Sequence, residues 1–154
     1  FRMGKISSLS KSIAILASVV MLVISSLVFS SPAEAKNYKV TMGAGGLKFA
    51  PKKVTVQPGD TVTFKNGMLP PHNVMFNPPK SPNEKLSKEL SKKKLEELSK
   101  KKLAISKALS HKKFLMKPGE SFDVNIPDDA PSGDYEFFCL PHRGAGMVGH
   151  MIVE

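Results

Sequence analysis

The chain has 154 residues, and its 23 Lys and Arg against 13 Asp and Glu give a formal net charge of +10. This length allows one domain with an appendage, and a hydrophobic content of 41% argues against a wholly disordered chain. A single Cys excludes a disulfide-stapled scaffold and a four-Cys zinc module. A basic chain usually suggests nucleic acid or an anionic membrane as its partner. That inference holds only if the positive charge is spread over the folded domain, so the location of the charge must be known first.

The N-terminus has the three parts of a secretory signal peptide. Basic residues precede an uncharged, mostly apolar stretch over Ile13–Phe29, and an Ala-Glu-Ala sequence follows at 33–35. This pattern predicts export and cleavage after Ala35, so that 1–35 is the signal peptide and 36–154 the mature domain. A retained membrane anchor is the alternative, but the apolar stretch is at the short end of what spans a bilayer.

The mature chain begins with short runs in which apolar residues alternate with polar ones. In chain order these runs contain Val54 and Val56, Val62 and Phe64, Phe122 to Ile126, Tyr135 to Cys139, and Met151 and Val153. Turn sequences rich in Gly and Pro, such as Pro58-Gly59-Asp60, separate the runs. Short strands at this spacing predict an all-β sandwich.

Residues 80–113 interrupt this pattern with 12 lysines and four glutamates. The segment opens with Ser81-Pro82-Asn83-Glu84, which has the form of a capping box with Pro at the first helical position. At helical spacing, one narrow apolar stripe contains Leu95, Leu98, Ile105 and Leu109. Leu86 and Leu90 lie about a quarter turn away from that stripe, so the helix is expected to bend or split. We therefore expect an amphipathic helix inserted in the β domain.

The net charge is concentrated in this Lys-rich segment. It carries +8 of the total, the signal segment carries +2, and the rest of the mature chain has equal numbers of basic and acidic residues. Because the β domain is neutral and the chain is expected to be exported, nucleic acid is not an expected partner.

Four candidate metal ligands stand out in the mature chain. Cys139, His142 and Met147 lie in one short C-terminal stretch, and His72 lies far upstream. One thiolate, two imidazoles and one thioether suit copper better than zinc, calcium or magnesium, and a His2Cys site with a weak axial Met is the blue-copper arrangement. Taken singly, a Cys next to two aromatic residues or a lone Met more often belongs to a core. The four residues together, in an exported chain with an unpaired Cys, predict a metal site.

At these residues the chain resembles plastocyanin, the blue-copper protein of oxygenic photosynthesis, in its cyanobacterial form. The resemblance is carried by Pro58-Gly-Asp-Thr-Val62, Pro71-His-Asn-Val74 and, most specifically, Pro141-His-Arg-Gly-Ala-Gly-Met-Val-Gly149. It implies a cupredoxin fold, that is, a Greek-key β-sandwich of about eight strands. The implied ligands of its single type 1 copper ion are His72, Cys139, His142 and Met147.

The resemblance also implies a function. A plastocyanin is a monomer that carries electrons from cytochrome f of the cytochrome b6-f complex to photosystem I in the thylakoid lumen. It docks transiently, cycles between Cu(I) and Cu(II), and is not an enzyme. Asn73 is implied to hold the two ligand loops together, and the ring edge of His142 to reach an apolar surface. Phe138 stands where the family usually has a Tyr whose ring is exposed on a second docking face.

Three other functions compete with this one. A pseudoazurin-like periplasmic electron donor to a reductase shares the Cys-x2-His-x4-Met spacing. A copper carrier or chaperone usually clusters Met and His residues, whereas the methionines of the mature chain are scattered here. A copper enzyme would need further His ligands such as a His-x-His pair, which the sequence lacks. His111 and His150 have no second ligand at useful spacing, so both are expected to be structural or on the surface.

The Lys-rich segment has two main interpretations. A solvated helix that covers one side of the sandwich is the simpler one. The sharper hypothesis is electrostatic steering toward acidic partner surfaces, with a strong salt dependence. Membrane association would be peripheral at most, because attachment to anionic lipid needs more apolar surface than these leucines supply.

Overall fold

The structure, a computed structural model, describes residues 34–68, 71–80 and 91–154. Nearly all of the expected signal peptide, the capping box at 81–84, Leu86 and Leu90 lie outside these residues. Ala35–Glu154 form one compact unit. Its elements are β1 (Asn37–Met42), β2 (Phe49–Ala50), β3 (Lys53–Val56), β4 (Thr61–Asn66), β5 (His72–Phe76), α3 (Lys92–Leu109), β6 (His111–Leu115), β7 (Ser121–Asn125), β8 (Gly133–Phe138), the 3-10 turn η1 (Arg143–Ala145) and β9 (Val148–Val153).

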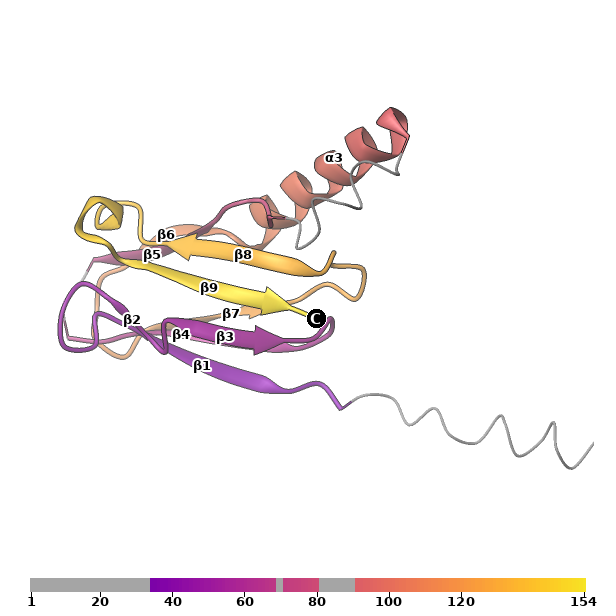
Figure 1. Cartoon of the computed structure of the whole chain (residues 1–154). Helices are drawn as coiled ribbons and strands as arrows, with labels where there is room; N and C mark the ends of the chain where they lie inside the picture. Colours follow the sequence, from indigo (N-terminus) through magenta and orange to yellow (C-terminus); the bar gives the residue numbers. More distant parts are fainter. Residues whose placement is uncertain (1–33, 69–70, 81–90) are drawn as a thin grey trace, which may run out of the picture. The chain divides into compact units, whose positions relative to one another are not determined.

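The strands of the described residues form two sheets, which confirms the predicted sandwich (Figure 1). One sheet has the order β2-β1-β4-β7 and the other the order β3-β9-β8-β5-β6. These are nine strands rather than about eight. The alternating runs on either side of the Pro58-Gly59-Asp60 turn become β3 and β4, which belong to different sheets. This turn therefore carries the chain from one sheet to the other and does not close a hairpin.

The core lies between the sheets and is built around phenylalanine rings. Phe64 of β4 and Phe137 of β8 meet edge to face with their ring centroids 5.2 Å apart. Phe49 adds a second edge-to-face contact with Phe137 at 4.8 Å. Such contacts stabilise a core beyond the burial of apolar area alone, and they favour one packing over others. The strand that leads to Cys139 is therefore held in place by the core.

The Lys-rich segment is only partly helical in the described residues. Helix α3 begins at Lys92 and ends at Leu109, and the next residues form strand β6 at the edge of the five-stranded sheet. The expectation of helix up to residue 113 was therefore wrong at its C-terminal end, where pairing of β6 with β5 takes over. The predicted stripe is confirmed, since Ile105 and Leu109 are buried and Leu95 and Leu98 are half-buried. Among the described residues, no helix is both long enough and apolar enough to cross a bilayer.

Candidate metal centre

The four candidate ligands lie at one end of the sandwich, on two segments of chain. His72 is the first residue of β5, and Cys139 directly follows the last residue of β8. His142 and Met147 lie on either side of η1 in the connection from β8 to β9. The backbone folds this connection back on itself, because the N–H of Cys139 donates to the Met147 carbonyl and the N–H of Met147 donates to the His142 carbonyl, both at 3.2 Å. Gly146 permits the turn with a φ of 83°.

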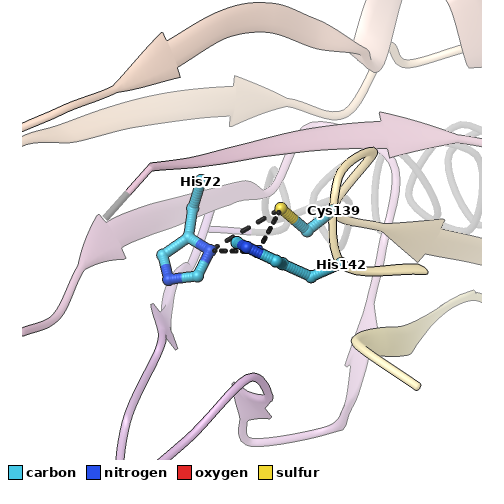
Figure 2. Close-up of side chains that lie close together, drawn as sticks. All are labelled: His72, Cys139 and His142. Atoms are coloured by element: carbon cyan, nitrogen blue, oxygen red, sulfur yellow. Dashed lines mark hydrogen bonds between the residues drawn. The ribbon is translucent and has the colours of Figure 1, made fainter. Parts of the chain in front are cut away.

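His72, Cys139 and His142 direct one ligand atom each toward a common point (Figure 2). The Cys139 Sγ lies 3.6 Å from the His72 Nδ1 and 3.4 Å from the His142 Nδ1, and the two Nδ1 atoms are 3.2 Å apart. A point equidistant from the three atoms lies about 2.0 Å from each of them, which is close to the length of a metal–imidazole bond. The donor set and its spacing therefore fit a single transition-metal ion.

Burial sets the electrostatics of this cluster. His72, Cys139 and Met147 are fully buried, whereas His142 is half-buried. Burial raises the pKa of the Cys139 thiol, while hydrogen bonds from the backbone N–H groups of Asn73 and His142 act in the opposite direction. A thiolate without a positive partner is thus unfavourable in this pocket, and a bound cation would stabilise it.

Asn73 joins the two ligand-bearing segments, as expected. Its Oδ1 accepts a hydrogen bond from the Leu140 N–H at 2.9 Å, one residue after Cys139. Its Nδ2 donates to the Lys112 carbonyl of β6 at 3.3 Å. The side chain is buried, and it links β5 to the ligand loop on one side and to β6 on the other. Sequence reasoning did not identify the link to Lys112, because a backbone carbonyl leaves no signal in the residue type.

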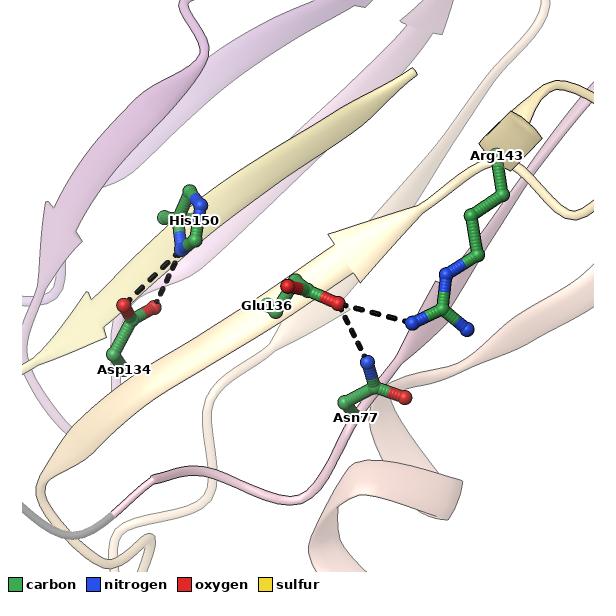
Figure 3. A network of polar contacts seen from close by, with 5 residues as sticks. All are labelled: Asn77, Asp134, Glu136, Arg143 and His150. Carbon is green, nitrogen blue, oxygen red and sulfur yellow. Dashed lines mark hydrogen bonds and ion pairs between the residues drawn. The ribbon is translucent and has the colours of Figure 1, made fainter. Parts of the chain in front are cut away.

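A second polar network holds the outer side of the ligand loop (Figure 3). The Arg143 Nη2 lies 3.2 Å from the Glu136 Oε1, which also accepts a hydrogen bond from the Asn77 Nδ2 at 2.7 Å. The Arg143 guanidinium lies over the Phe138 ring, 4.0 Å from its centroid. Phe138 is buried, so its ring is not exposed as the Tyr that the family usually has at this position. Glu136 was not among the residues singled out from the sequence.

His111 and His150 lie outside the ligand cluster, as expected. His150 pairs through Nδ1 with both carboxylate oxygens of Asp134, at 3.0 and 3.1 Å (Figure 3). His111 stacks on Phe122 with the ring centroids 3.9 Å apart. Among the described residues, the one group of three or more His, Cys, Asp or Glu side chains that could hold a metal ion is His72, Cys139 and His142.

Comparison with known proteins agrees with this geometry. Residues 36–154 match the family model of copper binding proteins of the plastocyanin/azurin family. The chain belongs to this family. It is 43% identical over 138 residues to the plastocyanin of Nostoc punctiforme, an alignment that covers 88% of this chain and 87% of that protein. It is 31% identical over 150 residues to the chloroplastic plastocyanin of Chlamydomonas reinhardtii, covering 97% of this chain and 88% of that protein.

A solved structure extends the likeness to the fold. The oxidised plastocyanin of Dryopteris crassirhizoma superimposes with a TM-score of 0.52 and 28% identity, over 75% of this chain and 99% of that one. The two-sheet sandwich is therefore a cupredoxin fold, as the resemblance implied. Membership of the plastocyanin/azurin family makes the chain a blue-copper electron carrier that docks transiently with redox partners.

Proposed function

We propose that this chain carries electrons from cytochrome f to photosystem I, with one copper ion held by His72, Cys139, His142 and Met147. The observation that carries the proposal is the triangle of two Nδ1 atoms and one Sγ, with 3.2 to 3.6 Å between the atoms. Copper bound in such a site supplies a one-electron couple between Cu(I) and Cu(II). The 43% identity to a plastocyanin supports this pair of partners over a periplasmic reductase.

Each ligand residue has a distinct role in this proposal. Cys139 supplies the thiolate, and the two His residues supply neutral imidazoles through Nδ1. Met147 supplies the weak axial thioether, for which its complete burial and its place in the folded loop are the support. Asn73 and the Glu136–Arg143 pair hold the loop in place, so that little rearrangement accompanies the change of charge.

Electrons are proposed to enter and leave at His142. It is the one half-buried member of the buried ligand cluster, so its ring connects the site to the surface. Exposed Leu140 and Pro141 precede it, and exposed Gly144 and Ala145 follow Arg143. Uncharged side chains of this kind permit close approach by a partner, and a small apolar contact dissociates quickly. Export by the predicted signal peptide would place the carrier in the thylakoid lumen.

The copper site is tested by adding Cu(II) to the purified protein and recording the visible spectrum. We expect an intense band from charge transfer between the thiolate and copper, which Cys139→Ser abolishes. Met147→Leu should shift the band and the reduction potential. Met151→Leu is the matched control, because Met151 is equally buried but lies in β9. Failure to form the band, a band that survives Cys139→Ser, or equal effects of both Met variants would contradict the ligand assignment.

The partners are tested by rapid kinetics. The Cu(II) form should oxidise reduced cytochrome f, and the Cu(I) form should re-reduce photosystem I after a flash. A Cu(I) protein that donates to a nitrite reductase but not to photosystem I would instead support the pseudoazurin-like alternative.

A further inference from the structure

Helix α3 presents a dense group of lysines in its described part. Of its 18 residues, seven are Lys and two are Glu. We call these seven residues the lysine surface: Lys92, Lys93, Lys94, Lys100, Lys101, Lys102 and Lys107. All but Lys102 are exposed, and Lys102 is half-buried. Within this surface, Lys100 pairs with Glu96 at 3.1 Å and Lys101 pairs with Asp129 at 3.0 Å. Both pairs are exposed, so they offset only part of the positive charge.

The apolar side of α3 is used to attach the helix to the sandwich. Ile105 and Leu109 belong to the buried core, and the Ser110 hydroxyl accepts a hydrogen bond from the Phe76 N–H at 2.9 Å. The Lys101–Asp129 pair adds a contact to the loop between β7 and β8. Because Ile105 and Leu109 pack in the core, they are not available for insertion into lipid. The other leucines of α3, half-buried Leu95 and Leu98 and exposed Leu103, offer only a small apolar surface. What the helix presents to solvent is mainly charge.

The lysine surface lies away from the copper end of the sandwich. Strand β5 runs from His72 at the metal centre to Phe76, and α3 joins the sandwich at Phe76 through Ser110. The pairing of β5 with β6 agrees, since His72 is opposite Leu115 whereas Val74 is opposite His111, two residues after the helix. Figure 1 shows α3 beyond the end of β5 that lies opposite the connection from β8 to β9. When the lysine surface contacts an acidic partner, the copper end therefore faces away from that partner.

Charge in the loop that carries three of the ligands is balanced. From Cys139 to Gly149 the single charged residue, with His taken as neutral, is Arg143, and it pairs with Glu136 at 3.2 Å. The lysine surface of α3 is thus separate from the ligand loop, and exposed Lys112 and Lys113 belong to β6, which pairs with β5.

The stability of the helix does not account for the lysines in its first turn. Lys92, Lys93 and Lys94 occupy the positive end of the helix dipole, the first turn contains no acidic residue, and Ser91 makes no side-chain capping bond. Lysines at this end destabilise a helix, typically by about 0.3–1 kcal/mol each. An acidic surface placed against them would offset both the mutual repulsion and the dipole.

We propose that the lysine surface of α3 is a second docking surface, separate from the copper end, which binds an acidic protein surface of a redox partner. The identity of the partner as a redox protein rests on the proposed function, whereas the location of the surface does not. Docking through α3 leaves His142 accessible, so the carrier can be held near one protein while it exchanges electrons through its other end. This differs from simple steering, in which the charges would guide the copper end itself into contact.

The test is an NMR titration of the copper-loaded, reduced protein with poly-L-glutamate at low salt. We expect amide shift changes over 92–109 and none over 139–147. Replacing Lys92, Lys93 and Lys94 by Gln should weaken binding roughly tenfold, which corresponds to about 0.5 kcal/mol for each charge. The matched control replaces Lys52, Lys53 and Lys65 by Gln, since these three lysines are exposed on the sandwich, and should weaken binding less than threefold.

Three results would overturn the proposal. Equal weakening of poly-L-glutamate binding by both triple variants would mean that binding does not depend on the lysine surface in particular. Shift changes over 139–147 would place the contact at the copper end. Binding to vesicles of phosphatidylglycerol and phosphatidylcholine, without binding to poly-L-glutamate, would make an anionic lipid surface the ligand instead. The amide shifts report on α3 whether or not the visible band forms, so failure of this proposal is distinct from failure of the copper assignment.

Discussion

Asn73→Ala is expected to lower both the stability of the fold and the affinity for copper. The change removes the hydrogen bond from the Leu140 N–H at 2.9 Å and the one to the Lys112 carbonyl at 3.3 Å. Each contributes about 1 kcal/mol, and a buried group left without its partner adds to the loss, so we expect unfolding to become easier by roughly 2–3 kcal/mol. Loss of a residue that positions metal ligands typically lowers metal affinity about 10- to 100-fold.

Asn66→Ala is the matched control for this prediction. Asn66 and Asn73 are both 1% exposed, and each side chain makes two hydrogen bonds to the backbone; Asn66 donates both of its own, to the carbonyls of Leu115 and Lys117. It makes no hydrogen bond to the loop that carries Cys139 and His142, and among the described residues its Oδ1 has no hydrogen-bond partner. Its removal should therefore cost about 1–2 kcal/mol in stability and leave copper affinity nearly unchanged.

Two measurements separate these effects. Urea unfolding of the copper-free variants gives the change in stability, and competition with a Cu(I) chelator gives the change in affinity. If Asn73→Ala binds copper as tightly as Asn66→Ala does, then Asn73 is only a structural residue, and the reasoning that it positions the ligand loop is refuted.

Three further predictions concern the helix, the core and the pH dependence. Leu109→Ala should lower the free energy of unfolding in urea by about 2–5 kcal/mol because Leu109 is buried. The control Leu103→Ala, at an exposed position, should lower it by less than about 1 kcal/mol. Equal losses would show that α3 is not anchored through its apolar stripe. Gly149→Ala should cost about 1–3 kcal/mol or more, since the added Cβ would lie 2.4 Å from the Phe137 ring; unchanged urea unfolding would contradict that close approach. Burial, together with nearby Lys113, lowers the pKa of His111 in the folded protein. The folded state therefore binds a proton on this imidazole less readily than the unfolded state does. Its contribution to stability is full above the pKa of the unfolded state and is lost as the pH falls through the pKa of the folded state. In unfolding measured at pH 7.5 and pH 5, His111→Phe should therefore lose less stability on acidification than the unchanged protein, and an equal loss would refute this.

The sandwich and the composition of the site could be predicted from sequence because their signals are local. Alternation in runs such as 122–126 follows from the two-residue period of a strand that buries one face. The ligands Cys139, His142 and Met147 are close in sequence, so a short loop brings them together wherever the domain folds. The stripe of α3 is local for the same reason.

Other features needed the tertiary structure because they depend on residues far apart in the chain. The approach of His72 to Cys139, across 67 residues, depends on which strand neighbours β8 in the sheet. The network around Arg143 likewise includes Asn77, whose Nδ2 donates to the Glu136 Oε1 across 59 residues. No spacing along the chain encodes such contacts, since they result from the packing of whole sheets.

The charge of this protein shows the same division. That the β domain is neutral and that the excess of lysine belongs to one amphipathic segment can be read from the residues alone, because charge and helical period are properties of neighbouring residues. The position of that segment follows only from the folded molecule. Burial of Ile105 and Leu109 in the core, together with the bond from Phe76 to Ser110, places the lysines away from His142. A helix takes its position from the surface against which it buries its apolar side, and that surface is assembled from distant parts of the chain.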